Sequence, residues 1–216
     1  MTMIPQSEVL RYLGTQSADA PLMEQIQEIC AYMEQHITPH GIWREYPCTV
    51  TEDAAVCSDT VLPGKDLAAH LKGCTAFLLL ATTLGTEADR LARTEGARAS
   101  VRAAIVHAAG AAMIEQYCDD LQSQLAKEYE AKGLYLRPRY SPGYGDLPLS
   151  CQRDFFQLLE LPKRLGLSLN EHNMMTPSKS VTAVIGISPE AKKSFRKCFT
   201  CGKKDCPFRK KDTDTQ

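Results

Sequence analysis

The stretch Cys74–Thr83, with the sequence CTAFLLLATT, decides the fold. It is almost wholly apolar and lies between Gly73 and Gly85. Such a run between turn residues is typical of a fully buried strand, although periodicity alone does not exclude a helix. A second stretch, Lys179–Ser188 (KSVTAVIGIS), is rich in β-branched residues and also predicts a strand. Residues 41–58 suit short strands, and Leu165–Ser168 is strand-like.

Helical patterns surround these runs. Apolar residues recur at helical spacing over Leu22–Met33, and Asp19 is a suitable residue to begin that helix. Ala97–Lys127 predicts one long, alanine-rich helix that ends before Gly133, and Thr86 and Asp89 have the spacing of a capping box. Shorter helices are predicted at 65–71 and 150–161. Helices and strands mix without regular βαβ alternation, which favours the α+β class.

Composition places the chain among soluble globular proteins. Its 216 residues are 44% hydrophobic and 24% charged, and no window reaches the roughly 20 apolar residues of a membrane span. The N-terminus has no basic and apolar pattern of a signal peptide, so we expect a cytoplasmic protein. Nine cysteines, an odd number, argue against a disulfide framework there. Cys30, Cys74 and Cys118 sit in apolar patterns typical of small buried side chains.

The charge is unevenly distributed along the chain. Residues 190–216 hold nine Lys and Arg against four Asp and Glu, whereas acidic residues exceed basic ones in the rest. We therefore divide the chain into a domain at 1–189 and a basic, Cys-rich tail at 190–216. The tail suits an acidic protein face or nucleic acid, and a solvated tail is the plain alternative.

The loop Arg139–Tyr144 (RYSPGY) concentrates the candidate binding groups. Arg139 offers a planar cation suited to a carboxylate or phosphate, and Tyr144 offers an aromatic face and a hydroxyl. Pro142 and Gly143 permit a tight turn and close approach of the backbone to a ligand. From these residue types alone, a small-molecule site and a purely structural turn both remain open.

The pattern R-x-x-x-G-Y, followed closely by Pro148, resembles the S-adenosylmethionine-binding signature of the activation domain of vitamin B12-dependent methionine synthase. The resemblance continues through a helix, the segment LPKRLGLSLNEHNMMTP and the strand after Ser178, and spans roughly 9–188. It implies an α+β fold in which long helices flank a twisted antiparallel sheet.

The resemblance also implies roles for individual residues. Arg139 would pair with the ligand carboxylate, Ser141 would offer backbone hydrogen bonds, Gly143 would allow the turn, and Tyr144 would line the site. The family has an acidic ligand contact on the preceding long helix, for which Glu115 is the nearest candidate. The family's aromatic residue after the final strand has no clear match here.

The family's chemistry implies partners. Its members use S-adenosylmethionine and an electron from a flavodoxin-like donor to restore methylcobalamin in a corrinoid methyltransferase. This chain lacks the corrinoid-binding motif D-x-H-x-x-G. We therefore expect a partner protein to carry the cobalamin, and this chain to act in trans, by positioning groups without general acid–base residues.

The tail contains Cys198, Cys201 and Cys206 in the spacing C-x2-C-x4-C. Three thiols this close can bind zinc or part of an iron–sulfur cluster, and Cys151 is a candidate fourth ligand by chain position alone. The alternative is a reduced basic tail without metal.

Two other functions compete with the reactivation hypothesis. In one, the chain is a non-catalytic adaptor whose tail binds a partner, a metal or nucleic acid, nucleic acid being the less favoured. In the other, it is an autonomous methyltransferase, which is poorly supported because no candidate base stands beside the loop.

Overall fold

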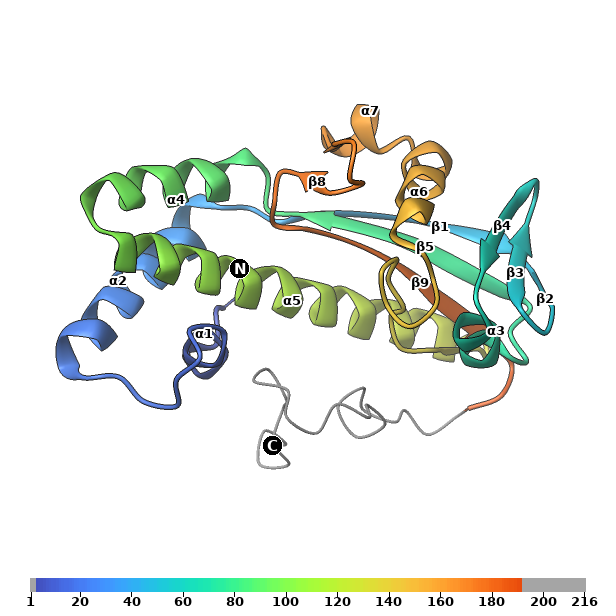
Figure 1. Ribbon diagram of the computed structural model, residues 1–216. Helices are drawn as coiled ribbons and strands as arrows, with labels where there is room; N and C mark the ends of the chain where they lie inside the picture. The colour runs from blue at the N-terminus through green and yellow to red at the C-terminus, as the bar shows by residue number, and fades with distance from the viewer. Residues whose placement is uncertain (1–2, 192–216) are drawn as a thin grey trace.

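A four-stranded antiparallel sheet organises residues 3–191, the part of the chain that the computed structural model describes. Its order is β1-β5-β9-β6, and every neighbouring pair is antiparallel. The strands are β1 (His40–Pro47), β5 (Ala76–Thr83), β6 (Tyr135–Leu136) and β9 (Ser180–Ser188). Helices pack on both faces of the twisted sheet (Figure 1). The predicted α+β class is confirmed.

β5 is the central strand, and all eight of its residues are buried. Side chains alternate between the two faces of a strand. Phe77 and Leu79 therefore join the core on one face, while Leu78 and Leu80 join the core on the other. This two-sided burial explains why the sequence of β5 is a continuous apolar run and does not alternate with polar residues.

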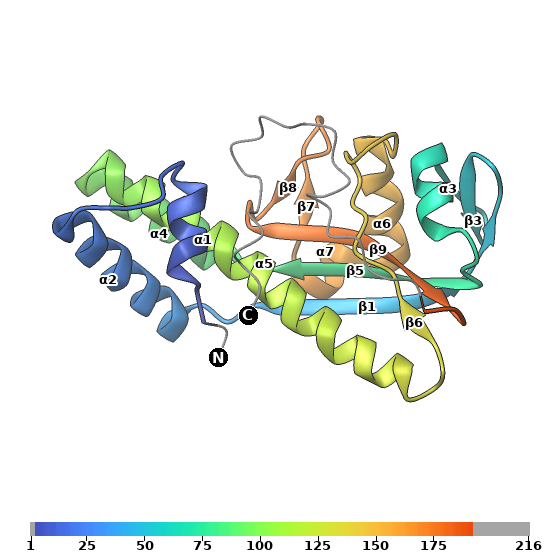
Figure 2. The same ribbon diagram turned by 90° about the horizontal axis from the view of Figure 1, so that it is seen from below.

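The long helix α5 (Ser100–Glu130) covers one face of the sheet (Figures 1 and 2). Leu121, Leu125 and Tyr129 pack there against β5 and β9. The approach to β1 is close, because a Cβ placed on Gly41 would lie 2.9 Å from Leu121 Cδ2. Because Gly41 has no side chain, α5 can pack closely against the edge strand β1.

The opposite face is covered by short elements. Phe155 is fully buried there and packs with Leu79 and Val184 in one core cluster. The covering elements are α3 (Lys65–Leu71), η1 (Leu149–Cys151), α6 (Gln152–Leu159), α7 (Leu161–Leu165) and a three-stranded sheet of β2 (Thr49–Val50), β3 (Ala54–Cys57) and β4 (Thr60–Pro63).

At the other end of the molecule, three helices pack on the N-terminal half of α5 (Figure 2). They are α1 (Gln6–Tyr12), α2 (Ala20–His36) and α4 (Thr86–Arg98). Asp19 caps α2 by accepting a hydrogen bond of 3.0 Å from the Leu22 N–H, as predicted. A small hairpin, β7 (Ser168–Leu169) and β8 (Met175–Thr176), precedes β9.

The predicted helix 97–127 is wrong at its start. Ala99 is extended (φ −160°, ψ 140°) and separates α4 from α5. The junction is held by the buried Glu95, whose carboxylate accepts hydrogen bonds from Arg98 and Arg102 on either side of the break.

Two further local predictions are corrected. The residue that caps α4 is Gly85, with no side-chain bond, because the Asp89 carboxylate accepts hydrogen bonds from Ser178 N–H and hydroxyl instead. The strand predicted at Leu165–Ser168 begins only at Ser168, since Leu165 ends α7 and Gly166 follows with positive φ.

Three cysteines predicted to be buried, Cys30, Cys74 and Cys118, lie in the interior. None of the helices within residues 3–191 combines the length and apolar character that a membrane crossing requires. The boundary between a domain at 1–189 and a tail at 190–216 stays a prediction.

Phe155 provides a test of the packing between α6 and the sheet. Phe155→Ala removes a fully buried ring and should lower the free energy of unfolding by about 3–5 kcal/mol. The exposed Val61→Ala is the control and should change it by less than about 0.5 kcal/mol. Chemical denaturation measures both, and equal effects would contradict the packing.

Candidate functional site

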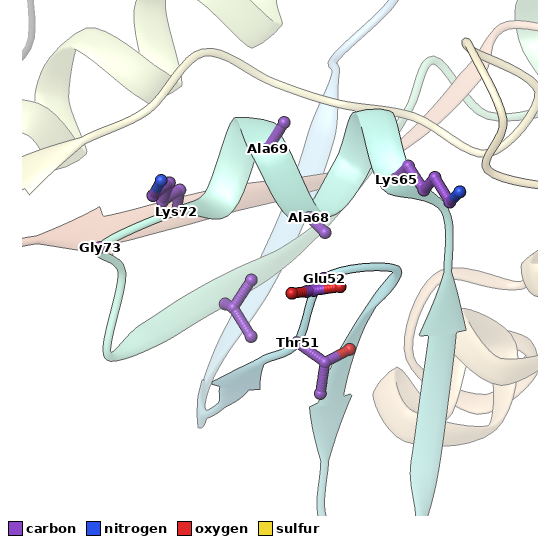
Figure 3. A pocket seen from close by; sticks show the side chains of 8 residues that line it. Thr51, Glu52, Lys65, Ala68, Ala69, Lys72 and Gly73 are labelled. Atoms are coloured by element: carbon purple, nitrogen blue, oxygen red, sulfur yellow. The ribbon is translucent and has the colours of Figure 1, made fainter.

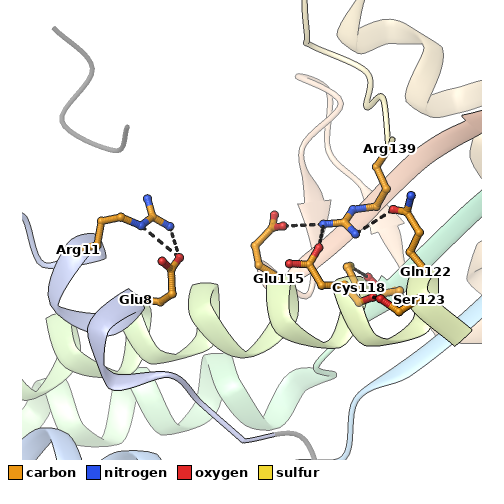
Figure 4. A network of polar contacts seen from close by, with 9 residues as sticks. Glu8, Arg11, Glu115, Cys118, Gln122, Ser123 and Arg139 are labelled. Carbon is orange, nitrogen blue, oxygen red and sulfur yellow. Dashed lines mark hydrogen bonds and ion pairs between the residues drawn. The ribbon is translucent and has the colours of Figure 1, made fainter. Parts of the chain in front are cut away.

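Arg139 is held at the edge of the main sheet. The next residue, Tyr140, exchanges two backbone hydrogen bonds with Val184 of β9, at 2.9 and 2.8 Å. This bridge fixes the backbone beside Arg139, and the side chain reaches from the sheet edge to α5 (Figure 4). A tight backbone pair therefore positions the cation.

The Arg139 guanidinium contacts three side chains of α5. Nη2 lies 3.0 Å from Glu115 Oε2 and 2.7 Å from Asp119 Oδ1, and Nη1 donates to Gln122 Oε1 at 3.1 Å. The three positions follow at intervals of four and three residues, so they share one face of the helix. Figure 4 shows Glu115 and Gln122 on that face. The structure thus brings together Arg139 and Glu115, both predicted as site residues.

The cluster has more acid than base. One guanidinium meets two carboxylates, and the Arg139 side chain is 11% exposed whereas Glu115 and Asp119 are 45% and 54% exposed. The excess negative charge therefore faces solvent, where it can receive a cationic group.

Burial and nearby charges shift the pKa values of Arg139 and of the neighbouring Cys118. Burial raises the pKa of Cys118 to about 11, even though its contact of 3.1 Å with the Thr82 hydroxyl and the charge on Arg139 act to lower it. Burial alone would lower the pKa of Arg139, but Cys118, Asp119 and Glu115 together raise it. At neutral pH, Arg139 is a cation above a neutral thiol.

The loop after Arg139 folds into consecutive turns. The Tyr144 N–H donates to the Ser141 carbonyl at 3.1 Å, and the Gly143 N–H donates to the Leu147 carbonyl at 2.8 Å. Gly143 has φ +90°, a conformation that favours glycine. Leu147 is buried and anchors the loop, whereas Tyr144 is 56% exposed. The loop therefore presents an aromatic ring at the surface on a fixed backbone.

Beside this loop, the described residues place no strand on the outer edge of β9 before Val184. Within residues 3–191, β6 and Tyr140 pair with the outer edge of β9. This pairing covers only the part of β9 from Val184 to Ser188 (Figure 2). Because backbone groups alternate along a strand, those of Thr182 and Ser180 point to the same edge as those of Val184. Within residues 3–191 these groups have no strand partner; Thr182 is 1% exposed, whereas Ser180 is half-buried and can be reached by a ligand.

A surface hollow lies elsewhere, between α3 and the β2–β3 turn (Figure 3). It measures about 490 Å³ and is lined by side chains such as Thr51, Glu52, Lys65 and Lys72. None of the predicted site residues lines it. We place the candidate site at the edge of the sheet, where charged groups converge, and not in this hollow.

The predicted metal ligands Cys198, Cys201 and Cys206 lie outside the described residues. Cys151, the suggested fourth ligand, is buried at the start of α6. Residues 3–191 contain no group of three or more His, Cys, Asp or Glu side chains arranged to hold a metal ion. Zinc or an iron–sulfur cluster in the tail stays a prediction.

Sequence reasoning missed Asp119 and Gln122, which contact Arg139 as directly as Glu115 does. Their signal was available, because they stand four and seven residues after Glu115 on a predicted helix. What the sequence could not supply was the rotation of α5 relative to the sheet, which decides that this polar face meets Arg139.

Comparisons with known proteins agree with this fold. No curated protein matches the sequence. A crystal structure described as the MetH reactivation domain bound to AdoHcy superposes with a TM-score of 0.62 at 19% identity, covering 80% of this chain and 66% of that one.

The chain thus spans just under two thirds of that structure, and the likeness shows a shared fold. A family model described as vitamin B12 dependent methionine synthase, activation domain, matches residues 79–205, more than half of the chain. The matched range contains most of β5, all of α5, the Arg139 loop and β9, which together build the candidate site. This chain is therefore a member of the vitamin B12-dependent methionine synthase activation domain family.

Proposed function

We propose that this protein binds S-adenosylmethionine at the Arg139 site and supports reductive methylation of cobalamin carried by a partner corrinoid methyltransferase. Family membership and the shared fold support the class of reaction. The related reactivation domain was crystallised with AdoHcy, the demethylated form of the same compound. The proposal assigns ligand contacts to Arg139, Glu115, Ser141, Gly143 and Tyr144.

The arrangement of two carboxylates on one guanidinium carries the proposal. The amino-acid end of S-adenosylmethionine bears one carboxylate and one ammonium group. The ligand carboxylate can replace Glu115 or Asp119 on Arg139, and the displaced side chain can then accept the ammonium group. The exchange raises the number of ion pairs from two to three, so the charges of the site complement an amino-acid zwitterion.

The remaining groups suit the rest of the ligand. The half-buried Ser180 at the start of the β9 edge offers a backbone donor and acceptor, and the exposed Tyr144 ring offers a face for stacking. The Ser141–Tyr144 turn brings backbone close to this edge, and Gly143 permits that conformation. A ligand bound at the Arg139 end of this edge, where Glu115 and Asp119 are exposed, would stay accessible to a partner.

The corrinoid supplies the methyl-accepting cobalt, and one electron must come from a separate reductant, for which a flavodoxin-like protein is our proposal. The residues of this chain would fix the head group at Arg139 and orient the sulfonium methyl outward. Such positioning needs no general acid or base, because the transferred group is a methyl and not a proton.

Arg139→Ala should weaken S-adenosylmethionine binding by about 30-fold or more in a calorimetric titration, since a partly buried charge-assisted contact is lost. The exposed Arg93→Ala is the matched control and should bind as wild type does. No saturable binding by the wild type, or equal binding by Arg139→Ala, would contradict the proposed site.

Glu115→Gln and Asp119→Asn test recognition of the ammonium group. Each removes one of the two negative charges, and the double variant should lose about tenfold or more in affinity for S-adenosylmethionine. An analogue without the α-amino group should bind wild type and double variant alike. If both ligands lose affinity equally, the carboxylates do not recognise the ammonium group.

Action in trans is tested with methyl-labelled S-adenosylmethionine, a chemical reductant and a purified corrinoid methyltransferase. We expect one AdoHcy for each labelled methyl group on the partner's cobalamin, and no transfer with Arg139→Ala. Label on cobalamin at the same rate without this protein would count against a reactivation role.

A further inference from the structure

A second arginine, Arg137, is buried outside the Arg139 site. It is 4% exposed and follows β6 at the end of the sheet. Its Cγ lies 3.0 Å from the position that a Cβ on Gly186 would occupy, so the stem packs flat on β9 where only glycine fits. Leu71 and Cys74 crowd the same position, which places the Arg137 stem on the α3 side of the sheet.

The guanidinium of Arg137 has few partners. Within residues 3–191 its only hydrogen bond runs from Nη2 to the Ser188 hydroxyl, at 3.0 Å. Nε is buried without a hydrogen-bond partner, the only such side-chain atom in that part of the chain. No carboxylate there lies within ion-pair distance, whereas Arg139 has two. A buried cation without an anion is costly, and an orphaned donor adds to the cost.

The backbone around Arg137 is firmly held, so the side chain cannot easily relax into solvent. The Arg137 N–H donates to the Gly186 carbonyl at 2.8 Å, and Gln122 Nε2 donates to the Arg137 carbonyl at 3.0 Å. His70 Nε2 lies 2.8 Å from the carbonyl oxygen of Pro138, the next residue. Strand, long helix and α3 together keep the cation in place.

We propose that Arg137 is the receptor for a carboxylate or another small oxyanion that comes from outside residues 3–191. The planar fork of a guanidinium binds both classes with paired hydrogen bonds. The Ser188 hydroxyl stands beside it at the point where β9 ends. The anion is either free in solution or supplied by this chain, whose last residues include Asp205, Asp212 and Asp214. The proposal does not depend on S-adenosylmethionine binding.

Thermal unfolding of the full-length protein tests the site with inorganic phosphate as the probe and chloride at matched ionic strength as the reference. Arg137→Met keeps an apolar stem and removes the cation, and Arg93→Met, on the surface, is the matched control. If the anion is free in solution, the rise in melting temperature of wild type and control at saturating phosphate should exceed that of Arg137→Met by about 3–6 °C.

A second arm identifies the source of the anion. If the chain fills its own site, combining Asp205→Asn, Asp212→Asn and Asp214→Asn should lower the melting temperature of the wild type but not that of Arg137→Met. In the wild-type background, the combined variant should also gain the response to phosphate. The proposal is overturned if Arg137→Met changes neither the phosphate response nor the effect of the aspartate substitutions.

Arg137→Lys keeps the inference testable should Arg137→Met fail to fold. Lysine retains the charge but not the planar fork or Nε. We expect a phosphate response less than half that of wild type, and an undiminished response would overturn the proposal.

Discussion

The contact between the Arg139 guanidinium and the acidic face of α5 is the interaction on which the candidate site depends. It joins the outer edge of the sheet to the helix that covers one face. The contact therefore requires that the sheet edge and α5 keep a fixed position relative to each other. The bridge from Tyr140 to Val184 sets the edge, and the close packing of Leu121 over Gly41 sets the helix. A shift of either would separate the charges.

Much of the fold was predictable because its strongest signals are local. β5 and β9 are apolar or β-branched along most of their length, and the cap at Asp19 has a direct physical cause. The errors arose where a long-range contact outweighed a local pattern. Hydrogen bonds from Arg98 and Arg102 to the Glu95 carboxylate stabilise the break at Ala99. The Asp89 carboxylate accepts a hydrogen bond from Ser178 and does not form the predicted capping box.

The site was predictable only in part, for the same reason. The RYSPGY loop can be found by its residue types, and Glu115 by resemblance, but the pairing of Glu115, Asp119 and Gln122 with Arg139 depends on how α5 is rotated against the sheet. That rotation is set by packing on Leu78 and Leu80, which no local pattern reveals. The buried Arg137 likewise gave no signal, since a lone arginine in a loop is normally solvated.

The candidate site is a charge cluster beside a strand edge that has no strand partner within residues 3–191, and this geometry makes a specific claim about where a ligand lies. A crystal structure of the protein with S-adenosylmethionine tests it most directly. The account predicts the ligand carboxylate within hydrogen-bond distance of Arg139, the ammonium group at Glu115 or Asp119, and the remainder along Ser180–Thr182. A ligand bound in the hollow between α3 and the β2–β3 turn, with Arg139 still paired to both carboxylates, would contradict it.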